Sequence, residues 1–100
     1  MKVNTQSVNF TADIKLIDFI DKKLKKLTQF YDKVISADVY LKVENTSEKQ
    51  NKVVEVRLEV PGDSLIFKRV ARTFEEGTDM AVDSLQRQLK KRKEKLRTYM

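Results

Sequence analysis

Apolar and polar residues alternate in two stretches of the chain, residues 37–44 and 54–60. Alternation with a period of two is the pattern of a strand with one buried face. Residues 2–10 and 65–72 are also rich in β-forming side chains and predict two further strands, of which the last is the least regular. A polar stretch at 45–51 predicts a loop, and Pro61-Gly62-Asp63 predicts a turn. Because short connections join the last three strands, we expect them to form an antiparallel meander, whereas periodicity leaves the partner of the first strand open.

Two other stretches repeat their apolar residues at helical spacing. The first covers roughly residues 13–31, with Asp13 or Thr11 as its cap, and its apolar positions are Leu16, Ile17, Ile20, Leu24, Leu27 and Tyr31. The second covers about 74–97 and follows Thr73, which forms a capping-box pattern with Glu76. Its apolar positions are Phe74, Thr78, Ala81, Leu85, Leu89 and Leu96. Gly77 lies inside this helix and should cost about 1 kcal/mol relative to alanine, unless close packing requires it.

The predicted order of elements is β-α-β-β-β-α, which places the chain in the α+β class. Each later strand has one apolar face, so we expect a four-stranded sheet with both helices packed on one face. This arrangement resembles the double-stranded RNA-binding fold by analogy. We expect residues 1–100 to form a single domain, because no linker-like stretch divides them. The second helix should be about 35 Å long, so that its basic end, residues 87–100, projects past the sheet.

Composition favours a folded protein that acts in the cytoplasm. The hydrophobic fraction is 40%, and no apolar run reaches the roughly 18 residues of a membrane span. The first residues lack the apolar core of a signal peptide. The chain has no cysteine, so no disulfide framework is expected, and a reducing compartment is the simplest assignment.

The net charge of +6 is concentrated at one end of the chain. Residues 87–97 hold seven of the 21 basic residues and one of the 15 acidic ones, which leaves 14 of each sign elsewhere. Such a concentration implies a polyanionic partner. The alternative interpretation is an ordinary solvated helix end without a partner. Seven positive charges this close repel one another, which disfavours that alternative. The seven basic residues are Arg87, Lys90, Lys91, Arg92, Lys93, Lys95 and Arg97.

Two smaller groups of cations extend the candidate RNA-binding surface. The first helix carries Lys22, Lys23, Lys25 and Lys26, and the fourth strand and its end carry Lys68, Arg69 and Arg72. If the helices lie side by side, these groups and the C-terminal cluster could form one broad basic surface for phosphate contacts. For the lysines of the first helix, an ordinary solvated face is an equally good interpretation.

The residues needed for most catalysis and metal binding are absent. The chain has neither histidine nor cysteine, so zinc and iron–sulfur sites are not expected, nor are a catalytic residue or a cofactor. Asp79 and Asp83 are expected to be exposed partners of Arg87 and similar residues. The phenylalanines, Phe30 among them, are expected to be mostly core, which favours recognition of structured RNA by shape and phosphate geometry over stacking on unpaired bases.

Three runs of residues carry a resemblance to a known family: 83–96 (DSLQRQLKKRKEKL), 19–27 (FIDKKLKKL) and 37–44 (ADVYLKVE). Together, in this order and spacing, they resemble the ribosome hibernation-promoting factors and ribosome-associated translation inhibitors, also called sigma-54 modulation proteins. The resemblance covers essentially the whole chain. The chain departs from the family pattern in three places: Thr73 stands where aspartate is frequent, Glu75-Glu76-Gly77 replaces a frequent Tyr-Ala, and Arg92 stands where histidine is frequent.

The resemblance implies a short form that binds the decoding cleft of the small ribosomal subunit and its ribosomal RNA. There it would block messenger and transfer RNA and inhibit translation in stationary phase or stress. Neither DNA nor membrane is an expected partner, whereas a separate ribosome-dimerising protein is compatible with a short form. The alternatives are a protein-interaction module whose basic helix binds an acidic partner or an anionic membrane, and a small enzyme, which the missing histidine and cysteine disfavour.

Overall fold

The structure is a computed structural model that describes the backbone of residues 1–98 and the side chains of residues 1–95. Its elements follow the predicted order β-α-β-β-β-α, with a short 3₁₀ turn, η1, added after the first helix. In chain order they are β1 (Lys2–Val8), α1 (Ile14–Lys25), η1 (Lys26–Gln29), β2 (Ser36–Val43), β3 (Lys52–Val60), β4 (Asp63–Ala71) and α2 (Phe74–Thr98).

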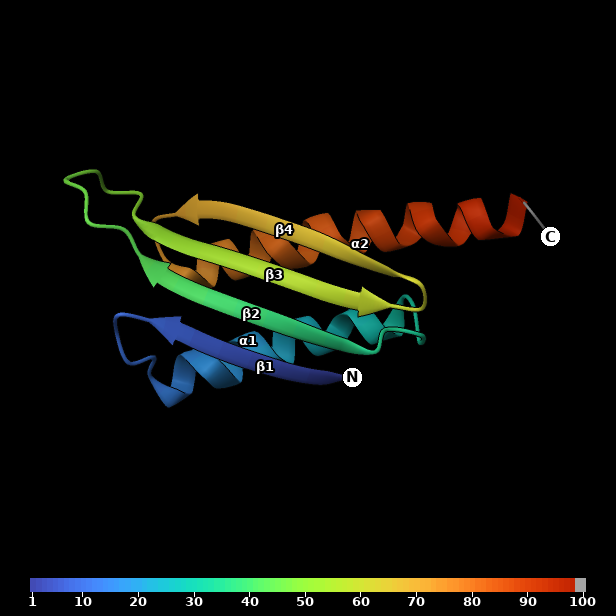
Figure 1. The fold of residues 1–100 in the computed structure, drawn as a ribbon, viewed down its shortest axis with the longest axis horizontal. Coiled ribbons are helices and arrows are strands. Elements are labelled where there is room, and N and C mark those ends of the chain that lie inside the picture. Colours follow the sequence, from blue (N-terminus) through green and yellow to red (C-terminus); the bar gives the residue numbers. More distant parts are fainter. Residues whose placement is uncertain (99–100) are drawn as a thin grey trace.

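The strands form one sheet in the order β1-β2-β3-β4 (Figure 1). The last three strands pair antiparallel, as their short connections predicted. The strand whose partner the pattern left open, β1, pairs parallel with β2, with Val3 beside Ala37 and Ser7 beside Leu41. A parallel neighbour requires a crossover connection, and α1 provides it. β1 ends at Val8 because Asn9 adopts a left-handed backbone conformation with φ of 65°, which breaks the extended chain.

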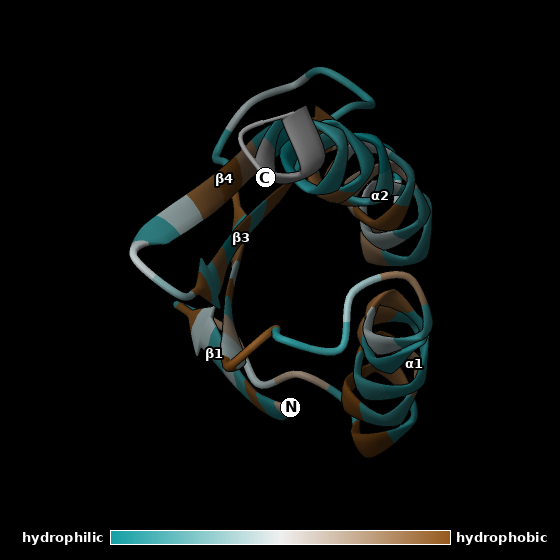
Figure 2. Ribbon diagram, turned by 90° about the vertical axis from the view of Figure 1, so that its right-hand side faces the viewer, coloured by the Kyte–Doolittle hydropathy of each residue, from teal (hydrophilic) through white to brown (hydrophobic). Residues whose placement is uncertain are grey.

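Both helices cover the same face of the sheet (Figure 2). Alternate residues of β2 and β3 point into this layer and are fully or almost fully buried, which explains their period of two. On the helices, Ile20 and Leu24 of α1 and Leu85 and Leu89 of α2 are buried against them. The α+β class with both helices on one face is therefore confirmed.

The first helix is shorter than its apolar pattern predicted. Asp13 is the cap, and its carboxylate accepts a hydrogen bond of 3.2 Å from the amide of Lys15. After Lys25 the chain continues as the 3₁₀ turn η1. There the hydroxyl of Thr28 donates a hydrogen bond of 2.7 Å to the carbonyl oxygen of Lys25, a local bond of the kind that competes with regular helix.

The start of α2 is held in three ways. Thr73 is the cap, and its hydroxyl oxygen accepts a hydrogen bond of 3.0 Å from the amide of Glu76. The ring of Phe74 stacks on that of Phe10 with centroids 5.1 Å apart. Gly77 lies so close to the sheet that a Cβ there would be 2.5 Å from Cγ2 of Val54. Close packing therefore explains why this helix position is glycine.

The two helices run in the same direction, and α2 extends beyond the sheet at the end where β3 turns into β4 (Figure 1). Its last turns are therefore exposed on most sides. Within the described part of the chain, no helix is both long enough and apolar enough to cross a membrane.

Candidate nucleic-acid interface

The last turns of α2 carry cations that face solvent. Lys90, Lys91, Lys93 and Lys95 are all exposed. Among the residues whose side chains are described, none of these four forms an ion pair. Leu89, which directly precedes Lys90, is buried, so the helix is anchored to the core at the point where these lysines begin. The side chain of Arg97, also a predicted contact residue, lies outside the described residues.

Arg92 differs from the lysines around it because it continues the buried stripe of α2. Its side chain is 21% exposed. Its guanidinium donates one hydrogen bond of 2.6 Å to the carbonyl oxygen of Pro61 and another of 3.3 Å to Oδ2 of Asp63. Sequence reasoning placed Arg92 with the RNA-facing cations, whereas the structure uses its charge within the molecule. A bidentate donor suits this role better than a lysine would.

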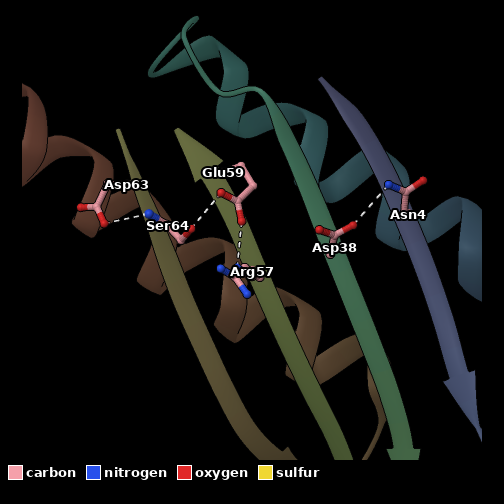
Figure 3. A network of polar contacts seen from close by, with 6 residues as sticks. All are labelled: Asn4, Asp38, Arg57, Glu59, Asp63 and Ser64. Carbon is pink, nitrogen blue, oxygen red and sulfur yellow. Dashed lines mark hydrogen bonds and ion pairs between the residues drawn. The ribbon is translucent and has the colours of Figure 1, made fainter. Parts of the chain in front are cut away.

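Asp63 is itself held in place by the sheet, as Figure 3 shows. Its Oδ1 accepts a hydrogen bond of 2.7 Å from the amide of Ser64. The hydroxyl of Ser64 donates to Glu59 at 2.8 Å, and Glu59 accepts a further bond of 2.8 Å from Arg57. Arg92 thus ties the end of α2 to a polar network that spans β3 and β4.

The lysines of α1 and η1 are partly neutralised. Lys23 pairs with Asp79 of α2 at 3.1 Å and lies 5.4 Å from the centre of the Phe19 ring, so it joins the two helices. Lys25 pairs with Asp21 at 2.9 Å. Lys22 and Lys26 are exposed and form no ion pair among the described side chains.

The two acids of α2 that were expected to be exposed partners of cations both form such pairs. Arg87 pairs with Asp83 at 3.5 Å, one helical turn away. Asp79 pairs with Lys23 of α1 at 3.1 Å. Exposed pairs of this kind contribute little to stability, and Arg87 stays accessible to a ligand.

The cations of β4 do not join the others in one surface. The register pairs Lys68 with Glu55, on the sheet face turned away from the helices. Arg69 pairs with Val54 on the helix-covered face, and Arg72 precedes α2. Both are exposed, but they lie near the start of α2, at the opposite end of that helix from Lys90. Of the two smaller groups of cations, that of the first helix lies beside α2, where Lys23 contacts Asp79.

The sheet face turned away from the helices mixes charges of both signs. Tyr40, Glu55 and Lys68 are neighbours in one row across it. In the next row, Asp38 accepts a hydrogen bond of 3.2 Å from Asn4 (Figure 3). The helical layer at the end of α2 is therefore the more strongly positive face.

One aromatic side chain is exposed where sequence reasoning expected core. Phe30 is 45% exposed, whereas its neighbour Tyr31 is 7% exposed and Leu27 is fully buried. The helical spacing of Leu27 and Tyr31 turns both inward and leaves Phe30 on the flank. In the sequence, only the helical spacing of Leu27 and Tyr31 relative to Phe30 could have indicated that Phe30 is exposed.

Among the described residues, no group of three or more acidic, histidine or cysteine side chains is arranged to hold a metal ion. What the site offers chemically is positive charge on a rigid helix, which suits contacts with phosphate groups.

Comparison with known proteins agrees with this picture. The family model described as "Sigma 54 modulation protein / S30EA ribosomal protein" matches residues 3–97. The chain belongs to this family. The family resemblance predicted from the three sequence runs is thereby confirmed.

Two curated members of the S30EA family and one solved structure illustrate the relationship. The ribosome hibernation promoting factor of Pseudomonas putida is 30% identical over 100 residues, which cover 100% of this chain and 94% of that protein. The factor of the same name from Klebsiella oxytoca is 29% identical over 99 residues, covering 99% of this chain and 100% of that one. A ribosomal subunit interface protein from Coxiella burnetii has the same fold, with a TM-score of 0.81, 18% identity, and coverage of 93% of this chain and 98% of that chain.

Proposed function

We propose that this chain is a ribosome hibernation factor of the cytoplasm that binds ribosomal RNA in the decoding cleft of the small subunit. In that position it blocks messenger and transfer RNA and inhibits translation in stationary phase or stress. Its relatives are named for ribosome hibernation, and family membership supports a role on the ribosome.

The observation that carries the proposal is the set of four exposed lysines on the last turns of α2. No described side chain neutralises them by an ion pair. Unneutralised cations on a projecting helix fit a concave, phosphate-lined surface such as a cleft in ribosomal RNA. Arg87, Lys22 and Lys26 extend the contact on the helical layer. We assign Arg92 to support of the helix, and leave Lys68 outside this surface.

Binding to separated ribosomal subunits tests the proposal. The protein should sediment with purified small subunits and not with large subunits. Small subunits loaded beforehand with messenger and transfer RNA should bind much less of it. Adding the protein to a cell-free system should inhibit translation. Equal binding to both subunits, or binding unaffected by messenger and transfer RNA, would contradict the assignment to the decoding cleft.

A further inference from the structure

Phe30 combines exposure with a fixed position. Its amide donates a hydrogen bond of 3.1 Å to the carbonyl oxygen of Leu27, directly after η1. The buried side chains of Leu27 and Tyr31 anchor the backbone on both sides of it. The ring is thus held on the flank of the helical layer, with 45% of its surface in contact with solvent. A rigid, exposed aromatic ring is the element that proteins use to stack an unpaired base.

The ring forms one wall of a recess of about 390 Å³ between the end of η1 and α2. The other wall is one flank of α2, where Gln86, Lys90, Lys93 and Glu94 follow one another at helical spacing. This volume lies at the small end of ligand pockets, which run from about 300 to 1,000 Å³. The recess therefore has an aromatic side, a cationic side and an amide side chain, Gln86, able to bond to a base edge.

We propose that this Phe30 recess binds one unpaired RNA nucleotide, with the base stacked on Phe30 and the adjacent phosphates held by Lys90 and Lys93. The inference rests on the proposed function and deepens it, because it adds a single-stranded contact to binding by shape and phosphate geometry. Gln86 offers a donor and an acceptor to the edge of the base.

Charge favours a nucleotide over an apolar protein segment in this recess. Lys90 and Lys93 outnumber the single acid, Glu94, and neither lysine forms an ion pair with a described side chain. An apolar segment would remove both ammonium groups from water with more positive than negative charge in the recess, which is unfavourable. A nucleotide supplies the counter-charge and the stacking surface together.

The chain contains no tryptophan, so a Phe30→Trp variant has its single tryptophan at the proposed site, where it can be excited selectively. Stacking on a base should quench its fluorescence. The probes are a short single-stranded RNA of mixed sequence and the same strand annealed to its complement, both at low salt. The matched control is Tyr40→Trp, which places the only tryptophan on the opposite, open sheet face, where Tyr40 is 39% exposed. We expect the single strand to quench Phe30→Trp strongly, the duplex to quench it less, and Tyr40→Trp to respond weakly to both.

Affinity for small ribosomal subunits provides the second measurement. Phe30→Leu removes the aromatic ring and keeps an apolar side chain, and should weaken binding about ten- to a hundredfold, the range expected for loss of one base–aromatic stack. Phe30→Tyr and Phe30→Trp keep a ring and should bind like the parent. Thermal melting checks that all variants fold, which the exposure of Phe30 leads us to expect.

The outcomes separate this inference from the proposed function. If Phe30→Leu binds subunits like the parent, or if the single strand quenches Phe30→Trp no more than the duplex does, the nucleotide site is overturned while the basic helix end is untouched. If Phe30→Leu loses binding but RNA leaves Phe30→Trp unquenched, Phe30 contacts a protein, and the inference is again overturned. If the parent protein itself fails to bind subunits, the proposed function fails, and the fluorescence experiment still decides whether Phe30 stacks on RNA.

Discussion

The guanidinium of Arg92 lies 2.6 Å from the carbonyl oxygen of Pro61, a residue 31 positions earlier in the chain. This contact and the ion pair with Asp63 join the last described turns of α2 to the turn between β3 and β4. These contacts orient Lys91 and Lys93, which flank Arg92 and are themselves exposed.

Arg92 should therefore contribute to stability more than its neighbours do. Arg92→Ala should lower the free energy of unfolding by about 1–3 kcal/mol, because it removes charge-assisted hydrogen bonds from a mostly buried group. Lys91→Ala, which removes an exposed charge, should change it by less than about 0.5 kcal/mol. Urea unfolding followed by circular dichroism measures both. Equal stability of the two variants would show that the contact with Pro61 and Asp63 contributes nothing.

Reversing exposed charges should separate binding from folding. A double variant, Lys91→Glu with Lys95→Glu, should lose sedimentation with ribosomes and fail to inhibit translation in a cell-free assay. Its melting temperature should stay close to that of the parent, since exposed charges contribute little to stability. The matched control is Lys2→Glu with Lys49→Glu, two exposed lysines outside the helical layer, which changes the net charge equally. Equal loss of binding in both double variants would mean that net charge alone matters.

The salt dependence of binding should report the number of phosphate groups that the protein neutralises. Affinity for small subunits should fall steeply and linearly on a log–log plot as salt rises, because binding to phosphates releases counterions. Replacing Lys91 and Lys95 by alanine should reduce the slope by about two, which is one unit for each lysine that no longer binds a phosphate. Fluorescence anisotropy of labelled protein across a salt series gives both slopes. An unchanged slope would show that these two lysines do not contact phosphate groups in the complex.

Gly77 should be intolerant of even a methyl group. Gly77→Ala should gain about 1 kcal/mol of helix propensity, yet the added Cβ would lie 2.5 Å from Cγ2 of Val54. Overpacking of this kind costs about 1–3 kcal/mol, so the net effect should be a loss of stability. The loss should shrink in a Val54→Ala background, where the obstructing atom is absent. A double-mutant cycle by urea unfolding measures this coupling, and additive effects would argue against the contact.

The sequence predicted the elements well because burial and periodicity are directly linked. Residues 37–44 and 54–60 alternate because one sheet face is covered, and Leu85 and Leu89 repeat because α2 has one buried side. The partner of β1 was not predictable in this way, because its own alternation fits a parallel or an antiparallel neighbour. Only the position of α1 as a crossover decides the pairing.

The candidate site was predicted in its charge but not in its detail. The sequence located the cations, because a concentration of charge along the chain can be recognised without three-dimensional information. It could not show that Arg92 has partners 29 and 31 residues away, nor that Lys68 faces away from the helices. Phe30 was interpreted as core because hydrophobicity alone does not distinguish a ring on the flank of a helix from one beneath it.

The helices α1 and α2 run in the same direction, and the stacked rings of Phe10, before α1, and Phe74, at the start of α2, lie at the same end of the molecule. This arrangement affects how the molecule approaches a partner. At the start of α2 the acids Glu75 and Glu76 are offset by Arg69 and Arg72, whereas lysines are in excess at its far end, on a molecule 50 Å long. The side chains thus give the protein a large electric dipole moment along its long axis. The field of a polyanion exerts a torque on this moment, which turns the lysine end toward the polyanion before any contact forms. Alignment of this kind raises the rate of productive encounters, independently of the strength of the final contacts.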